Sequence, residues 1–463
     1  MSVNSPLGAT RSGVFGLRAP GLETRTASQS RLGILALAGI LVTGLLVAIS
    51  AAGTAKLLPS TVGAAVGAVG LQGSFGKTGI DLGGIGLTIV IAAMLGSYLM
   101  AVRSAGRLSP LLVLGTIAAL HALMLLAPVL FSTDVFSYQF YGRIGQVYHA
   151  NAYLAGPYAL HGDPLYSYIG YKWYSTATVY GPLFTALSNP LAPLSIPASV
   201  FAYKAIAAIS SLTVVALVWN GARLRGVDPV KAAVLVGLNP LVVVYGVGGG
   251  HNDLLMLVPM LAGIVLLLQR RGRLGAASIV VGAGIKLTAG LLLPFALAGS
   301  RGPLLSTRRR DILVGAGITA AILCIFSVIL FGTGPLHLPS TIEEVQSKGN
   351  WQSIPGFIGT RLGLGTVGHP VALILGALFA IVLAWLVWRV WQGRLDWIAG
   401  AGWAAFALLV TAASLLPWYV VWLMPLAALA RDRALWKASL ILTGVMVCFQ
   451  LLAYIPHGSA VGL

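Results

Sequence analysis

The chain has few acidic residues and almost no cysteine. Only 11 of its 463 residues are Asp or Glu, against 29 Lys or Arg, and charged residues make up 9% of the total. The two cysteines, Cys324 and Cys448, lie inside apolar runs, so we expect neither a disulfide nor a cysteine-based metal site. No phosphate-binding loop of the Walker kind occurs, and no spacing of His, Asp and Glu resembles a strong metal site. The sequence therefore predicts no disulfide, no Walker-type nucleotide site and no metal site.

Long apolar runs, by contrast, are abundant. The mean hydropathy is +0.90, and about a dozen runs approach the roughly 20 apolar residues that a membrane-spanning helix needs. We predict an all-α polytopic membrane protein, a bundle of about 11–13 transmembrane helices. The net charge of +18 comes from short Lys and Arg clusters between these runs. Such clusters are typical of cytoplasmic loops beside anionic lipid and do not indicate nucleic-acid binding.

Alternation of the basic clusters predicts the topology. Residues 1–31 are expected to be a disordered basic cytoplasmic tail, and 32–463 a single transmembrane domain in the plasma membrane. The first apolar run is predicted to be an uncleaved span and not a signal peptide, and the outer loop at 53–80 is expected to carry no chemistry. Three outer segments are candidates for an extracytoplasmic active site: 131–198, 246–253 and 333–369. The predicted spans lie at about 32–52, 82–102, 110–130, 199–222, 231–247, 254–269, 312–332, 370–391, 397–415, 418–430 and 437–455, with a broken hairpin at 274–299.

The most informative stretch is 131–157, which directly follows the third predicted span. It holds Asp134, placed where a charge avoids the full cost of burial in lipid. Burial at this boundary is expected to raise the pKa of Asp134 toward neutrality, as a general base requires. A second interpretation, compatible with the first, is that Asp134 caps the N-terminus of the helix that follows.

Three polar elements are candidates to bind an anionic group such as a phosphate near Asp134. Arg143 offers a planar fork that suits phosphate, although a snorkelling interfacial arginine is an equal alternative. Lys286 lies in the middle of an apolar run, where a charge is costly and therefore a functional candidate; its alternative is a structural ion pair with Asp253. The third element is the sequence GGGHND at 248–253, a generic anion cradle or else a flexible turn, with polar handles His251, Asn252 and Asp253.

Aromatic residues gather in the same outer segments. They fit an ordinary interfacial belt, but their concentration in polar loops also fits stacking against sugar rings. Asp163 is a further acceptor-binding candidate, or it simply opens a turn before Pro164. Glu343 and Glu344 are expected to lie in a solvated loop. The candidates for contact with an acceptor or sugar are Tyr138, Asp163, Tyr180, Trp351, Trp418 and Tyr419.

Seven short motifs between about 130 and 425 resemble one family in their order. They are STDVFSYQFYGR, NAYLAGP, GDPLY, VYGPLF, GGGHNDLLM, GIKLT and LPWY. The set is similar to the polyprenol-phosphate-mannose-dependent α-1,6-mannosyltransferases, which are GT-C-type membrane glycosyltransferases of bacterial lipoglycan synthesis. The resemblance implies a GT-C-type bundle whose extracytoplasmic loops carry the active site, and it implies that Asp134 is the catalytic base.

The resemblance also implies the substrates. The donor would be polyprenyl-phosphate-mannose, the acceptor an α-1,6-mannan of the lipomannan type or a glycolipid, and the reaction an inverting single displacement at the outer face of the plasma membrane. No nucleotide sugar or other cofactor is expected. A metal requirement is doubtful because a single Asp134 stands where such loops often carry two acidic residues. The alternative is a transporter or flippase of a lipid-linked sugar, but transporters tend to place polar groups near the midplane, whereas here they crowd one face.

Overall fold

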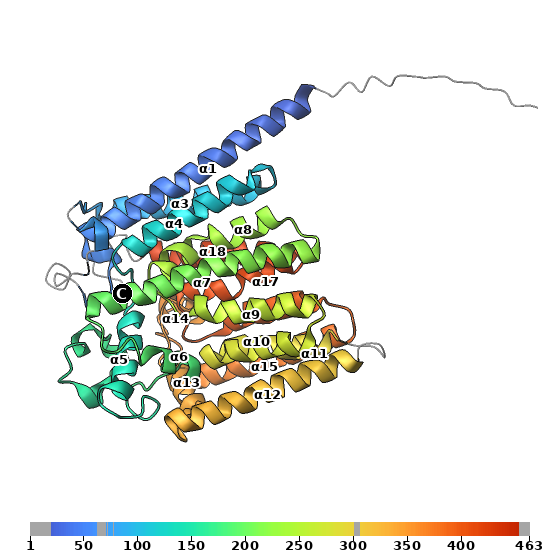
Figure 1. Ribbon diagram of the computed structural model, residues 1–463. Helices are drawn as coiled ribbons and strands as arrows, with labels where there is room; N and C mark the ends of the chain where they lie inside the picture. Colours follow the sequence, from blue (N-terminus) through green and yellow to red (C-terminus); the bar gives the residue numbers. More distant parts are fainter. Residues whose placement is uncertain (1–19, 63–70, 72, 77, 301–305, 453–463) are drawn as a thin grey trace, which may run out of the picture.

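The computed structural model describes residues 20–62, 71, 73–76, 78–300 and 306–452, and every regular element in these ranges is a helix. The long helices lie side by side in one bundle, and several of the short helices lie at one end of it (Figure 1). The helices of nine or more residues are α1 (Pro20–Gly53), α3 (Gly83–Ser104), α4 (Pro110–Leu126), α5 (Asp134–Gln146), α7 (Ile196–Arg225), α8 (Pro229–Gly237), α9 (Asp253–Leu268), α10 (Gly272–Ile285), α12 (Ser306–Phe331), α13 (Leu338–Ser347), α15 (His369–Trp391), α16 (Trp397–Thr411) and α18 (Arg433–Leu452).

Short elements connect them. The shorter ones that matter for the site are η1 (Ala55–Leu57), η7 (Tyr171–Trp173), α6 (Pro182–Ser188), η8 (Leu241–Val247), η9 (Leu287–Leu291), α11 (Leu292–Ala298), α14 (Ile354–Arg361), η12 (Pro417–Trp422) and α17 (Met424–Leu429).

Among the described residues, six helices are long and apolar enough to cross a membrane by length and composition: α1, α3, α7, α12, α15 and α18. The pair α8 and η8 passes the same test together, bent by 48°, and would be a seventh crossing. Shorter apolar helices, among them α4, α9, α10 and α16, pack between them. These findings confirm the predicted all-α polytopic membrane protein, while the count of about 11–13 crossings stays a prediction.

Two local expectations can be compared with the structure. Helix α1 begins at Pro20, so residues 20–31, expected to be disordered, are helical; residues 1–19 lie outside the described part. The broken hairpin at 274–299 is confirmed. Lys286 has an extended backbone (φ −149°, ψ 125°) between α10 and η9, which interrupts the helix where its side chain turns toward Asp253.

Packing explains which helices lie inside. Helix α9 contacts both α7 and α10, and α10 also contacts α12. A Cβ on Gly263 of α9 would lie 2.7 Å from the carbonyl oxygen of Gly275 in α10, so glycine is what allows these two backbones to approach. Helix α15 is the least buried apolar helix, and its exposed Leu373, Ile374 and Ile381 suit contact with lipid.

The two ends of the bundle differ in charge. One end, called the basic end below, holds helix termini rich in Lys and Arg. Two acidic residues there pair with nearby cations: Asp396 with Arg225 at 3.0 Å, and Asp311 with Arg273 at 2.7 Å. The opposite end, called the loop end, holds α5, α6, α13 and α14 (Figure 1). The basic residues of the basic end include Arg103, Arg225, Lys231, Arg273, Arg308 and Arg433.

Candidate active site

Asp134 lies at the loop end as the first residue of α5. Thr133, and not Asp134, occupies the capping position, and the backbone N–H of Asp134 donates to Ser132 Oγ at 3.1 Å. The Asp134 carboxylate Oδ2 lies 3.3 Å from Nδ1 of His251, and 18% of its side chain is exposed. The carboxylate therefore does not cap the helix. It contacts a histidine on one side and is partly exposed on the other.

The glycine turn at 248–253 brings His251 to Asp134. The backbone N–H of Leu130 donates to the Gly248 carbonyl at 3.1 Å, which joins the turn to the segment that leads into α5. Gly250 has φ +68°, and a Cβ there would lie 2.8 Å from Val135 Cγ1 in the first turn of α5. A residue without a side chain is required at this contact.

The turn does not offer its amides to an anion. The backbone N–H groups of Gly249 and His251 donate to the carbonyls of Tyr245 and Gly246, each at 2.9 Å. The expected anion cradle is thus wrong for these amides, because the tight turn uses them internally. Its role in the structure is to place His251.

Trp418 covers His251. The two rings stack with centroids 3.9 Å apart and planes inclined by 18°. Both side chains are buried, with 1% of His251 and 6% of Trp418 exposed. His251 is therefore buried, with Trp418 stacked on its ring and the Asp134 carboxylate beside its Nδ1.

Lys286 and Asp253 form the predicted ion pair. Their Nζ and Oδ1 atoms lie 2.6 Å apart, and Trp422 Nε1 donates to the same carboxylate oxygen at 2.6 Å. The ammonium also lies 4.6 Å from the ring centroid of Tyr419 and 5.2 Å from that of Trp422. Asp253 thus neutralises the lysine that we expected to meet a phosphate.

The electrostatic state of Asp134 differs from the expectation. Burial by itself raises the pKa of Asp134, but the contact with His251, and the positive charges of His251 and Lys286, lower it below its ordinary value. The expected rise toward neutrality is therefore wrong. The structure therefore favours the charged form of this carboxylate.

Asp134 opens onto a cavity of about 630 Å³ at the loop end. This volume lies within the range of about 300–1,000 Å³ that is usual for small-molecule sites. Two of the aromatic candidates, Trp351 and Trp418, line it, while their contact with a sugar stays a prediction. The wall combines segments far apart in the chain: Lys56, Leu58, Ser60, Phe131, Ser132, Thr133, Asp134, Gly170, Tyr171, Lys172, Trp173, Tyr245, Trp351, Gln352, Leu416, Trp418 and Gln450.

The cations that line this cavity are Lys56 and Lys172, and the sequence analysis singled out neither. Lys56 lies in η1, within the segment expected to carry no chemistry, and its side chain is exposed. Lys172 Nζ donates to the Gly349 carbonyl at 2.7 Å, and burial together with the charge of Lys348 lowers the pKa of Lys172. The only signal in the sequence for Lys56 was its position just after the first apolar run.

Lys204 of α7 is a third residue that the sequence analysis missed. It is 1% exposed, and its Nζ donates to the carbonyls of Ala127 and, at 2.9 Å, Pro128. Its side chain also packs against Gly250, where an added Cβ would lie 3.3 Å from Lys204 Cγ. Lys204 therefore lies beneath both segments that carry Asp134 and His251. The signal was present, since an ionisable residue inside a span is a functional candidate.

Arg143 and Asp163 form an ion pair, and neither residue lines the cavity. Arg143 Nη2 lies 2.7 Å from Asp163 Oδ2, and Tyr148 Oη donates to the same oxygen at 2.7 Å. The backbone N–H of Leu165 donates to Asp163 Oδ1 at 2.8 Å, and no part of the Asp163 side chain is exposed. The expected binding roles of Arg143 and Asp163 are replaced by a structural salt bridge.

Tyr138 and Tyr180 are also buried, with 1% and 8% exposed, and pack edge to face at 5.0 Å. Tyr138 Oη donates to Asn252 Oδ1 at 3.4 Å, and Asn252 is 3% exposed. These side chains support the glycine turn from below and present no ring to a sugar. Glu344, expected in a solvated loop, is exposed as expected but lies in the helix α13, and it pairs with Lys348 at 2.8 Å.

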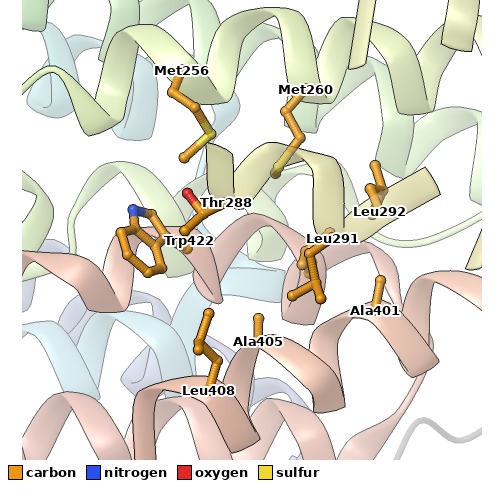
Figure 2. Close-up of a pocket in the computed structure, with 10 residues that line it drawn as sticks. Met256, Met260, Thr288, Leu291, Leu292, Ala401, Ala405, Leu408 and Trp422 are labelled. Carbon is orange, nitrogen blue, oxygen red and sulfur yellow. The ribbon is translucent and has the colours of Figure 1, made fainter. Parts of the chain in front are cut away.

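A second, apolar cavity of about 250 Å³ lies behind η12, where Tyr419 and Trp422 form part of its wall. Other wall residues come from α13, α15 and α16, including Ile342, Phe379 and Leu408. A narrow apolar cavity of about 20 Å³ shares Thr288, Leu408 and Trp422 with it and extends between Met256, Met260 and Leu291 (Figure 2). The aromatic segment 416–422 thus separates a polar cavity from an apolar one.

Two family models match the chain. Residues 32–300 match the alpha-(1->6)-mannopyranosyltransferase N-terminal domain, and residues 352–462 match the MptB C-terminal domain. The chain belongs to this family. Membership supports mannosyl transfer by a multi-pass membrane protein and accounts for the resemblance in the seven motifs.

Individual relatives of the chain are also named as alpha-(1->6)-mannopyranosyltransferases. The chain is 30% identical to alpha-(1->6)-mannopyranosyltransferase A of Mycobacterium tuberculosis over 370 residues, which are 74% of this chain and 69% of the relative. It is 29% identical to a probable alpha-(1->6)-mannopyranosyltransferase of Mycolicibacterium smegmatis over 412 residues, covering 77% and 71%. Identity to alpha-(1->6)-mannopyranosyltransferase B of Corynebacterium glutamicum is 27%, covering 67% and 57%. No solved structure matches significantly.

Proposed function

We propose that this chain transfers mannose from polyprenyl-phosphate-mannose to an α-1,6-mannan or related glycolipid acceptor at the outer face of the plasma membrane. The observation that carries the proposal is the ionised Asp134 carboxylate, which opens onto the cavity of about 630 Å³ with His251 at 3.3 Å behind it. Membership of the mannosyltransferase family supports the sugar, and the segregation of basic residues to the opposite end supports the sidedness.

In the proposed reaction, Asp134 accepts the proton from the 6-hydroxyl of the acceptor. The hydroxyl oxygen attacks the anomeric carbon of the donor mannose, and the bond from that carbon to the phosphate oxygen breaks as the new glycosidic bond forms. Attack from the face opposite the leaving group inverts the anomeric centre. His251 holds the carboxylate in place and favours its charged form before the reaction.

The leaving polyprenyl phosphate is an anion, and we assign its stabilisation to Lys56 and Lys172. They are the cations on the cavity wall, whereas Arg143 and Lys286 are already paired with carboxylates. Lys172 is held against the Gly349 carbonyl, so its charge is positioned before the donor binds. This assignment replaces the one expected from the sequence.

The prenyl tail needs an apolar path next to this polar cavity. The cavity of about 250 Å³ behind Tyr419 is lined mainly by apolar groups and is bounded in part by α15, the least buried of the six candidate membrane spans among the described residues. A donor whose head lies in the polar cavity and whose first isoprene units lie behind η12 would cross the aromatic segment 416–422. This position explains why Trp418 and Tyr419 face different cavities.

The test is transfer by the purified protein in detergent. Labelled polyprenyl-phosphate-mannose is mixed with a short α-1,6-mannoside, and the product linkage is determined by methylation analysis. We expect an elongated product with a new α-1,6 bond, and no product from an acceptor that lacks its terminal 6-hydroxyl. Transport needs two compartments, so a flippase would make no product in detergent. Elongation of the 6-deoxy acceptor, or absence of any product in detergent, would refute the proposal.

A further inference from the structure

A hollow of about 430 Å³ lies at the basic end, at the opposite end of the bundle from Asp134. It lies where the connection between α7 and α8 meets the connection between α17 and α18. Four cations and two carboxylates line it, together with one tryptophan and three apolar residues: Val227, Asp228, Lys231, Ala427, Ala428, Arg431, Asp432, Arg433, Trp436 and Lys437. Its composition differs from the apolar helix packing around it.

The two carboxylates are occupied by helix N-termini. Asp228 Oδ1 accepts from the backbone N–H of Val230 at 2.9 Å at the start of α8. Asp432 Oδ1 accepts from Ala434 N–H at 2.8 Å at the start of α18, while its Oδ2 accepts from Trp403 Nε1 at 2.9 Å. The carboxylates therefore offset the positive ends of two helices, and Asp228 Oδ2 also lies 3.9 Å from Lys231 Nζ. Four cations against two carboxylates leave the hollow with a net positive charge.

One of these cations is held in a strained conformation. Arg431 has φ +54°, which is uncommon for a residue with a side chain. A Cβ on Gly226 would lie 2.8 Å from Arg431 Nη2, so this guanidinium rests directly on the glycine backbone. Arg225 beneath it donates to the Leu429 carbonyl at 3.1 Å and to both oxygens of Asp396. These contacts hold the backbone on which Arg431 lies, and they maintain its unusual conformation.

We propose that this hollow binds the phosphate of an anionic lipid headgroup. The lining cations supply the complementary charge, and the hollow lies at the ends of the membrane-spanning helices α7 and α18, where headgroups are found. Trp436 supplies the amphipathic ring that is common at this depth of a bilayer. The site is separate from the mannosyl-transfer site and does not depend on that function.

The experiment measures lipid affinity of the full chain in detergent. Short-chain phosphatidylglycerol is titrated, and the thermal unfolding midpoint gives an apparent Kd; short-chain phosphatidylcholine and inorganic phosphate are separate arms. The test variant is R431Q/R433Q/K437Q. The matched control is R270Q/R271Q/R394Q, which removes the same charge from the same end without touching the hollow. Arg270 has φ +64°, so the control also changes one strained arginine.

Phosphatidylglycerol is expected to stabilise the wild type and the control alike, with the test variant weakened roughly a hundredfold, since each cation near a headgroup contributes about 1 kcal/mol, or a factor of about five. If the triple variant does not fold, K437Q alone should weaken binding roughly fivefold. Equal losses in test and control variants would show diffuse surface charge and overturn the site. Equal stabilisation by inorganic phosphate or phosphatidylcholine would overturn the anionic-lipid assignment, and no stabilisation at all would overturn the proposal.

Discussion

Two carboxylates of the loop end, Asp134 and Asp163, were both predicted to meet substrate, and the structure treats them differently. Asp163 has no exposed side-chain surface and is held by Arg143, Tyr148 and the Leu165 backbone. The Asp134 carboxylate has His251 Nδ1 at 3.3 Å and the Ser132 side chain as close polar neighbours, and 18% of the Asp134 side chain is exposed beside a large cavity.

The difference shows how a structural charge is told apart from a reactive one. A buried carboxylate whose lone pairs are filled by an arginine fork, a phenol and a backbone amide has no capacity left for a substrate. A carboxylate supported from one side only can still accept a proton from the other side. The predictions below test this contrast, from the largest expected effect to the smallest.

Replacing Asp134 by Asn should lower the rate of transfer by about 10²–10⁴-fold, since that is the usual contribution of a positioned general base. The unfolding midpoint should change little, because the side chain is partly exposed and not fully paired. Single-turnover transfer and thermal unfolding of the same preparation measure both quantities. Turnover within a few fold of wild type would contradict the assignment of the base.

Replacing Asp163 by Asn should have the opposite profile. It leaves Arg143 without its carboxylate in a partly buried site. Breaking a fully buried pair costs about 3–5 kcal/mol, which is the upper bound for the loss of stability here. We expect a lower unfolding midpoint with transfer per folded molecule largely kept. A stable D163N protein with transfer as low as that of D134N would mean that the two carboxylates do not differ as described.

Lys56 and Lys172 provide the third comparison. Replacing either by Gln should lower kcat/KM for the donor by roughly 10–100-fold, since a hydrogen bond to a charged group contributes about 1.5–3 kcal/mol. The control is Arg361→Gln, a cation of the same end that contacts Phe357 and does not line the cavity. Donor titration at fixed acceptor measures the effect, and equal losses in the control would remove both lysines from the site.

His251 should change the pH dependence more than the maximal rate. Transfer needs ionised Asp134, so activity is present above the pKa of Asp134 and is lost as the pH falls through it. His251 lowers that pKa, and therefore His251→Asn should move the acid limb of kcat/KM to higher pH. An unchanged acid limb in the variant would show that His251 does not support the carboxylate.

Much of the fold could be predicted because apolar length and basic loops reflect the membrane itself. The predicted spans at 82–102 and 370–391 match α3 and α15 closely. The break at Lys286 was predicted because the run at 274–299 carries a lysine at its centre and basic residues at both ends, which a single crossing cannot satisfy. The prediction of disorder was wrong for residues 20–31, which form the first part of α1, because no apolar pattern marks a polar helix.

The site was predicted less completely. Asp134, Trp351 and Trp418 line the cavity, and His251 lies directly behind them. Arg143 was misplaced because its partner Asp163 comes from another loop, and two long side chains can pair over any sequence separation. Lys56 and Lys172 were missed for the corresponding reason, since nothing local shows that their loops close over one cavity.

The sequence by itself determined that this chain is a helical membrane protein with one basic end, one aromatic loop end and an aspartate at the junction of a span and a loop. Only the tertiary structure decided which charged side chains are paired with each other and which line the cavity. The physical reason is that hydropathy acts on each segment separately, whereas neutralisation of a charge depends on which distant side chain lies within a few ångströms of it.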